Sequence, residues 1–193
     1  MSLVSYGALF TFPQILMNNF TKETKVNSGI SVFTDIIITS LVYSPFTIVS
    51  GYLSELKILG RKYSMAIGFV FSSLFALLAY LISSQLTLFN GLMQGCITIS
   101  YIILPIYDAE IYPTKIRTIG IGSGYTISRI GGITAPYICE FFFVYFDMIT
   151  SYLLFFIASV ICIYISHKLP YETHQTTLDN VDDLTKEMDL LKS

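Results

Sequence analysis

A cluster of charged residues interrupts an apolar chain between Tyr107 and Gly132. It holds two acids and three bases: Asp108, Glu110, Lys115, Arg117 and Arg129. A charge at the centre of a membrane helix costs roughly 2.5–3.5 kcal/mol, so such residues usually pair, face a bundle interior or line a pathway. Opposite charges at one membrane face can join helix ends and release them again, because ion pairs near water are individually weak. The cluster therefore predicts functional pairing of Glu110, Arg117 and Arg129.

The sequence gives little support for a metal site, a catalytic serine, a nucleotide site or nucleic-acid binding. His167 and His174 have no metal-ligand partners in motif spacing. No serine lies in a GxSxG turn, and no strand precedes the GIGSG segment, as a nucleotide site would require. The net charge of −2 gives no basis for binding nucleic acid. We expect no enzyme, metal site, cofactor or nucleic-acid partner, and we interpret three cysteines as small buried apolar residues: Cys96, Cys139 and Cys162.

The elements that carry the charges are predicted to be membrane helices. The 193 residues are 53% hydrophobic and only 12% charged, whereas soluble domains carry roughly 25% charged residues. A spanning helix needs about 20 mostly apolar residues. Six such runs predict an all-α, polytopic membrane domain over residues 1–168, with spans at about 2–20, 30–53, 64–83, 86–107, 119–142 and 149–166.

The basic residues predict the orientation of these spans. Most of them follow spans two, four and six, so these connections are expected to face the cytosol. An even number of spans places the N-terminus there too. Residues 169–193 form a polar, acidic tail, also expected in the cytosol. Four apolar residues recur in the tail at helical spacing, so it is either a solvated tail or a short docking helix: Val181, Leu184, Met188 and Leu191.

Polar and small residues within the spans indicate a cavity and close helix packing. Five polar or aromatic residues are candidates for lining a solute cavity: Gln14, Asp35, Tyr43, Gln94 and Tyr101. A buried Asp35 could bind a proton or an organic cation. Glycines at four-residue spacing, Gly91 with Gly95 and Gly120 with Gly124, predict close contact between helices. Four spans carry a proline, which suits either a moving protein or simple helix irregularity.

Several motifs resemble one transporter family. The segment EIYPTKIRTIGIG, residues 110–122, resembles the ExYPTxxRxxGxG signature of the major facilitator superfamily, in the branch of sugar, organic-ion and synaptic-vesicle-related transporters. RIGGITAP, residues 129–136, is similar to its continuation. GYLSELKILGRK, residues 51–62, resembles the cytosolic loop motif, and LPYETHQTTLDN after span six is similar to the stretch that follows the last helix.

The resemblance implies a fold, a gate and a function. Span one would correspond to the seventh helix of the family, so the chain would be a carboxy-terminal half, with the amino-terminal half missing. Such transporters rock two six-helix halves around a midplane site. The implied cytosolic gate network comprises Glu55, Arg61, Glu110, Arg117 and Arg129.

Three functions are consistent with the sequence. The first is transport of a small solute, a sugar or an organic ion, with a proton as a candidate coupling ion and an amino-terminal half supplied in cis or in trans. The second is a membrane interaction protein that binds other helices and transports nothing. The third is a homodimer of two such halves, since a two-fold axis along the membrane normal also relates the halves of a facilitator.

Overall fold

The structure is a computed structural model of the whole chain. It describes residues 1–23, 28–55, 60–82, 85–112, 114–147 and 149–169, without the side chains of 19–31 and 55. These residues form six helices and no strand, which confirms the all-α prediction. The helices are α1 (Ser2–Glu23), α2 (Ser28–Glu55), α3 (Gly60–Leu81), α4 (Leu86–Ile111), α5 (Arg117–Tyr145) and α6 (Thr150–His167).

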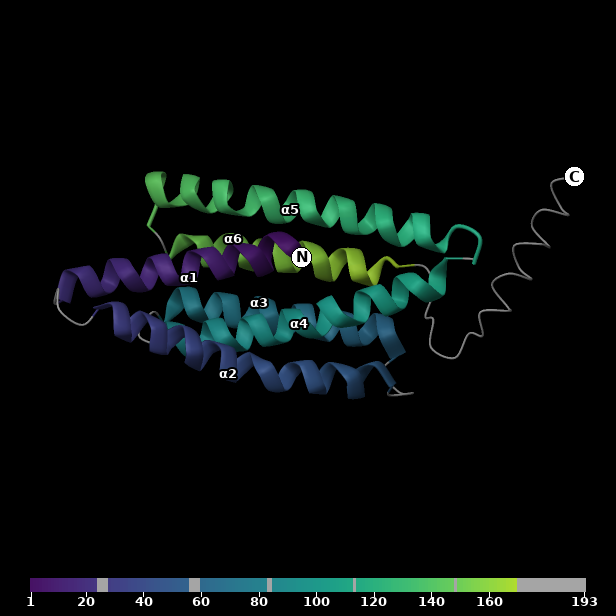
Figure 1. Ribbon diagram of the computed structural model, residues 1–193, viewed down its shortest axis with the longest axis horizontal. Helices are drawn as coiled ribbons and strands as arrows, with labels where there is room; N and C mark the ends of the chain where they lie inside the picture. The colour runs from purple at the N-terminus through teal and green to yellow at the C-terminus, as the bar shows by residue number, and fades with distance from the viewer. Residues whose placement is uncertain (24–27, 56–59, 83–84, 113, 148, 170–193) are drawn as a thin grey trace, which may run out of the picture.

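The six helices form an elongated bundle in which successive helices run in opposite directions (Figure 1). The ends of α2, α4 and α6 lie at one end of the bundle, shown on the right. α4 packs most extensively against α2 and α3, α3 against α6, and α1 against α5. The described residues of the loop motif and of the signature motif therefore lie at the same end of the bundle.

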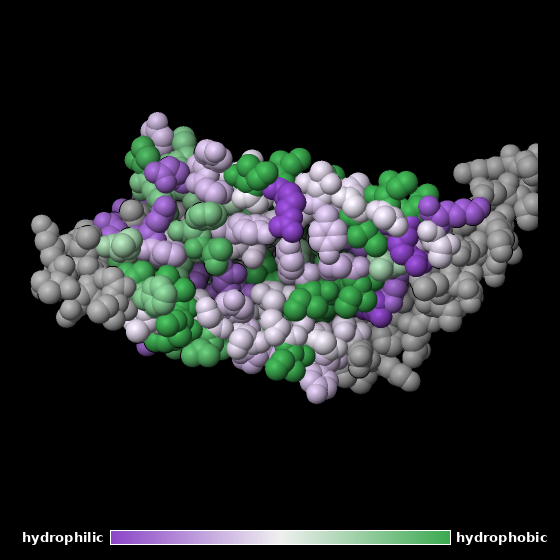
Figure 2. Space-filling model, viewed as in Figure 1, coloured by the Kyte–Doolittle hydropathy of each residue, from purple (hydrophilic) through white to green (hydrophobic). Residues whose placement is uncertain are grey.

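Five of the helices, α2 to α6, are long and apolar enough to cross a membrane. α2 and α5 bury few of their side chains inside the bundle and present apolar residues on the outside. Figure 2 shows patches of apolar side chains among weakly polar ones on the face in view, with hydrophilic side chains at both ends and near the middle of the upper part. The predicted span boundaries stay predictions, as does the membrane crossing of α1. The tail prediction lies, from residue 170 onward, outside the described residues.

Small residues let α4 approach its neighbours closely. A Cβ atom added to Gly95 would lie 2.6 Å from the Phe46 ring of α2. A Cβ atom added to Gly68 of α3 would lie 2.9 Å from the Cys96 carbonyl oxygen of α4. Next to it, the buried Ser100 hydroxyl donates a hydrogen bond of 2.8 Å to the Met65 carbonyl oxygen. The close contact predicted at Gly91 and Gly95 is confirmed.

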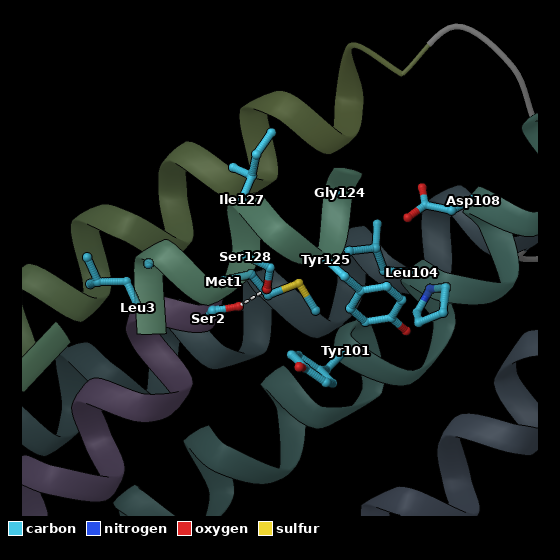
Figure 3. A pocket seen from close by; sticks show the side chains of 12 residues that line it. Met1, Ser2, Leu3, Tyr101, Leu104, Asp108, Gly124, Tyr125, Ile127 and Ser128 are labelled. Atoms are coloured by element: carbon cyan, nitrogen blue, oxygen red, sulfur yellow. Dashed lines mark hydrogen bonds between the residues drawn. The ribbon is translucent and has the colours of Figure 1, made fainter. Parts of the chain in front are cut away.

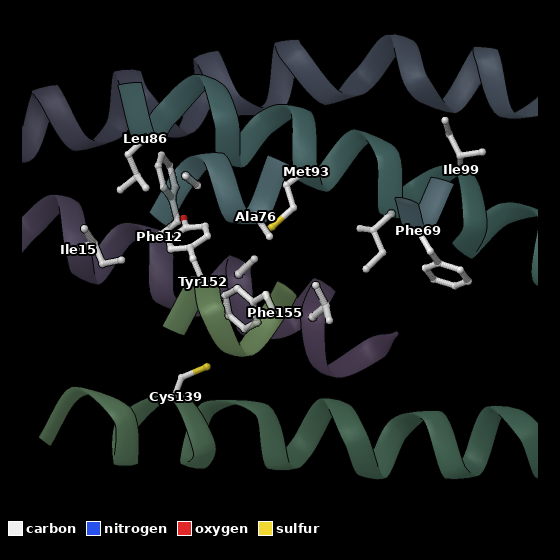
Figure 4. Packing of buried hydrophobic residues seen from close by; sticks show 14 of the residues in the cluster. Phe12, Ile15, Phe69, Ala76, Leu86, Met93, Ile99, Cys139, Tyr152 and Phe155 are labelled. Carbon is white, nitrogen blue, oxygen red and sulfur yellow. The ribbon is translucent and has the colours of Figure 1, made fainter. Parts of the chain in front are cut away.

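Large side chains fill the space between the helices (Figure 4). Tyr152 and Phe155 of α6 are fully buried, with their rings edge to face at 5.7 Å between centroids. The Tyr152 hydroxyl donates to Asn90 Oδ1 of α4 over 3.0 Å. A buried polar group must find such a partner, because leaving it unpaired costs about 1–3 kcal/mol. This hydrogen bond fixes the first turn of α6 against the start of α4 in the interior of the bundle.

Candidate functional site

An ion pair joins α3 to α4 at the right-hand end of the bundle in Figure 1. Gly60 opens α3 with a φ of 63°, a backbone conformation that glycine adopts without strain. Arg61 follows at once, and its Nη1 pairs with Oε1 of Glu110, the penultimate residue of α4. Both side chains are 20% exposed. The loop motif and the signature motif thus supply one partner each.

The end of α4 and the start of α5, which carry the signature motif, meet at a corner. Arg117, the first residue of α5, donates from Nε to the Tyr112 carbonyl oxygen over 3.3 Å. The Tyr112 ring lies over Gly120, where an added Cβ atom would come within 2.8 Å of it. The spacing of tyrosine, arginine and glycine in the motif therefore has a local structural reason. The arginine binds the turn, and the glycine makes room for the ring.

Arg129 lies apart from this corner. It is 12 residues beyond Arg117 on α5, which is roughly 18 Å along a helix. Its Nη1 donates to the Tyr6 hydroxyl of α1 over 2.6 Å, and it is exposed. The Glu55 side chain lies outside the described residues. The structure thus brings Arg61 and Glu110 together, sets Arg117 at the neighbouring corner and separates Arg129 from all three.

A cavity of about 230 Å³ lies between α1, α2 and α4. We call it the central cavity. Two of the predicted cavity residues, Tyr43 and Gln94, line it. Gln94 Nε2 donates to the Ser5 carbonyl oxygen of α1 over 3.2 Å. The polar lining consists of uncharged groups: Ser5, Tyr6, Thr39, Ser40, Tyr43, Asn90, Gln94 and Thr98. Such a set can donate and accept hydrogen bonds to a small solute.

A larger cavity of about 360 Å³ lies at the start of α1, between α4 and α5. We call it the α4–α5 cavity. Tyr101, another predicted cavity residue, lines it together with Asp108 of α4 and Tyr125 of α5 (Figure 3). Most of the remaining lining is apolar.

Asp35 and Gln14, the other two predicted cavity residues, line neither of these cavities. Asp35 accepts a hydrogen bond of 3.3 Å from the hydroxyl of Thr87, the second residue of α4. It therefore lies near the start of α4, at the end of the bundle opposite Arg61. Gln14 is exposed on α1.

Sequence reasoning did not single out Asn90, Tyr6 or Tyr152. Asn90 lines the central cavity four residues before Gln94, so helical spacing from a predicted residue could have found it. Asn90 and its hydrogen-bond partner Tyr152 are 62 positions apart in the chain. Tyr6 and its partner Arg129 are 123 positions apart. No local sequence pattern predicts hydrogen bonds between residues so far apart in the chain. Among the described residues, no group of three or more His, Cys, Asp or Glu side chains could hold a metal ion.

Comparison with known proteins gives the same family as the motifs. A model of the Major Facilitator Superfamily matches residues 1–183. The chain is 39% identical over 87 residues to the SVOPL protein of Danio rerio, covering 44% of this chain and 17% of that protein. It is 34% identical over 119 residues to organic cation/carnitine transporter 7 of Arabidopsis thaliana, covering 60% and 23%.

A third relative aligns with nearly the whole chain. Niacin transporter NiaP of Acinetobacter baylyi is 31% identical over 194 residues, which cover 93% of this chain and 41% of that protein. The chain therefore spans less than half the length of these three relatives. Its apolar helices and these matches indicate an integral membrane protein, and the chain belongs to the major facilitator superfamily.

Proposed function

We propose that the chain acts as the carboxy-terminal half of a secondary transporter that moves a small organic ion by alternating access. One observation carries the proposal: the Arg61–Glu110 ion pair, which ties together two motif-bearing helix ends at one end of the bundle. The names of two relatives, a niacin transporter and an organic cation/carnitine transporter, favour an organic ion over a sugar.

The ion pair is proposed to close the cytosolic mouth. Its two side chains are 20% exposed, so water screens them in part. A pair of this kind holds helix ends more firmly than a fully exposed pair, which contributes about 0–1 kcal/mol. The Arg61–Glu110 pair also separates at a lower free-energy cost than a fully buried ion pair, because breaking a fully buried pair costs about 3–5 kcal/mol. Arg117 would hold the adjacent corner, while Glu55 and Arg129 stay in the gate as predictions from the resemblance alone.

The central cavity is proposed to form one side of the solute pathway. Its uncharged hydrogen-bonding groups suit a small polar molecule, and the cavity lies between α1, α2 and α4. A second six-helix half, in cis or in trans, would complete the pathway, because facilitators bind their solute at the interface between two halves. A proton is a candidate coupling ion, and the tail is proposed to face the cytosol.

Uptake measurements test this function. Cells would express the chain together with an amino-terminal half, and labelled nicotinate, carnitine and glucose would be supplied separately. We expect uptake of an organic ion, and we expect Glu110→Gln and Arg117→Gln to reduce it at an unchanged amount of protein in the membrane. Lys115→Gln, at an exposed base near the same corner, is the matched control. No uptake of any of the three solutes, together with stable co-purification of a partner, would favour an interaction protein instead.

A further inference from the structure

The α4–α5 cavity has a lining unlike that of the central cavity. One face of α4 contributes Tyr101, Leu104, Pro105 and Asp108, which follow one another at spacings of three, one and three residues. α5 contributes Tyr125 and Ser128 from the opposite wall. Figure 3 shows the Tyr125 ring between Tyr101 and Asp108 in that view. The cavity thus combines a single side-chain carboxylate, two aromatic rings and an otherwise mostly apolar wall.

The Asp108 carboxylate is directed away from the ion pair of the proposed gate. Asp108 and Glu110 are two residues apart, so on a helix of 3.6 residues per turn they point in nearly opposite directions. Glu110 faces Arg61 of α3, whereas Asp108 lines the cavity beside α5. No salt bridge or side-chain hydrogen bond of Asp108 occurs within the described part of the chain. Its charge is therefore available to a ligand.

Each neighbouring positively charged group contacts a group other than Asp108. Arg129 follows Ser128 in the chain, but its guanidinium group donates to the Tyr6 hydroxyl. Arg117 donates from Nε to the Tyr112 carbonyl oxygen. The amino group of Met1 donates to Cys162 Sγ of α6 over 3.6 Å. The side chains that line the cavity include no lysine, arginine or histidine.

The same lining argues against other kinds of ligand. A sugar needs many hydrogen-bonding groups, but the hydroxyls of Ser2 and Ser128 bond each other, which leaves few for a ligand. An anion would be repelled by Asp108. A cation over the face of a tyrosine ring is attracted by the ring quadrupole, and a carboxylate adds a charge-assisted contact. The volume of about 360 Å³ lies at the lower end of the range for small-molecule sites, about 300–1,000 Å³.

We propose that the α4–α5 cavity binds a small organic cation, an alkyl- or arylammonium ion, with its charge at Asp108 and its apolar part against Tyr101 and Tyr125. This inference rests on the proposed function, because it names a solute class that such a transporter would take. It assigns the positive charge of the solute to Asp108 and not to Asp35, whose carboxylate accepts a bond from Thr87 near the opposite end of the bundle.

Binding of labelled benzyltrimethylammonium to the purified chain in lipid nanodiscs, measured by equilibrium dialysis, tests the site. We expect saturable binding that Asp108→Asn weakens by about tenfold or more, since the variant keeps the shape and removes the charge. Tyr125→Leu should weaken binding by about two- to fivefold, and Tyr125→Phe should leave it unchanged, because the ring face provides the attraction. Asp147→Asn, at an exposed acid outside the cavity, is the matched control.

Neopentylbenzene, the neutral carbon isostere of the probe, separates a cation site from an apolar groove. The proposal is overturned if this isostere competes as well as the unlabelled cation, if wild type shows no saturable binding, or if Asp108→Asn binds as tightly as wild type. Should Asp108→Asn fail to fold by size-exclusion chromatography, the two Tyr125 variants decide. Because binding is measured without transport, saturable binding with no uptake refutes only the proposed function, and uptake without binding at this cavity refutes only the site.

Discussion

The Arg61–Glu110 ion pair makes a quantitative prediction about stability. Two unit charges 4 Å apart attract by about 4 kcal/mol at an effective dielectric constant of 20, which is an upper limit here. Exposed pairs contribute about 0–1 kcal/mol, and loss of one partner from a buried pair costs about 3–5 kcal/mol. With both side chains 20% exposed, the pair lies between these cases. We expect a coupling free energy of about 1–3 kcal/mol.

A double-mutant cycle measures this coupling. Glu110→Gln, Arg61→Gln and the double variant would be unfolded by SDS titration in mixed micelles, and the free energies of unfolding compared with wild type. Each single variant should lose about 1–3 kcal/mol, and the double variant should lose clearly less than the sum of the two. Lys115→Gln, an exposed base at the same end, should stay within about 0.5 kcal/mol of wild type. A coupling below about 0.5 kcal/mol would show that the charges contribute independently, and it would refute the reasoning.

Two further predictions concern packing between the helices, both measured as the free energy of unfolding in the same micelles. Gly95→Ala should lower the free energy of unfolding by about 1–3 kcal/mol, because the new Cβ atom would lie 2.6 Å from the Phe46 ring. Gly122→Ala, where no atom lies within 4 Å of the new Cβ atom, is the control. An equal effect of the two substitutions would contradict this account. Tyr152→Phe should cost about 1–3 kcal/mol, because it leaves the buried Asn90 Oδ1 without its donor; an unchanged stability would show that this hydrogen bond contributes nothing net.

Much of the fold could be predicted from the sequence, because length and hydropathy constrain membrane helices strongly. In a bilayer the backbone must satisfy its own hydrogen bonds, so an apolar run of about 20 residues becomes a helix. Charged segments such as LKILGRK mark the connections. The spacing of Gly91 and Gly95 predicted a close helix contact correctly, because small residues on one helix face let a neighbouring helix approach closely. Gly124 follows the same spacing from Gly120, yet a Cβ atom there would meet nothing within 4 Å.

The site could be predicted less well, because pairing depends on which helices become neighbours. The motifs placed Arg61 and Glu110 in one network, and the structure brings them together. They also place Arg129 there, which stays a prediction. The hydrogen bond of Arg129 to Tyr6, 123 positions away on a helix that the motifs do not cover, could not be predicted from them. For Asp35, the sequence predicts a place within an apolar span. The hydrogen bond from Thr87 places it near a helix end instead, a fact that hydropathy does not record.

The most direct test of the proposed function is a charge exchange across the Arg61–Glu110 pair, read out as solute uptake. The chain would be expressed with an amino-terminal half as wild type, Arg61→Glu, Glu110→Arg and the double exchange, with the amount of protein at the membrane equalised. We predict that each single exchange abolishes most of the uptake, because two like charges then face each other at the mouth, and that the double exchange restores a substantial part of it. Full uptake by both single variants would contradict the proposal that this pair closes a transport pathway.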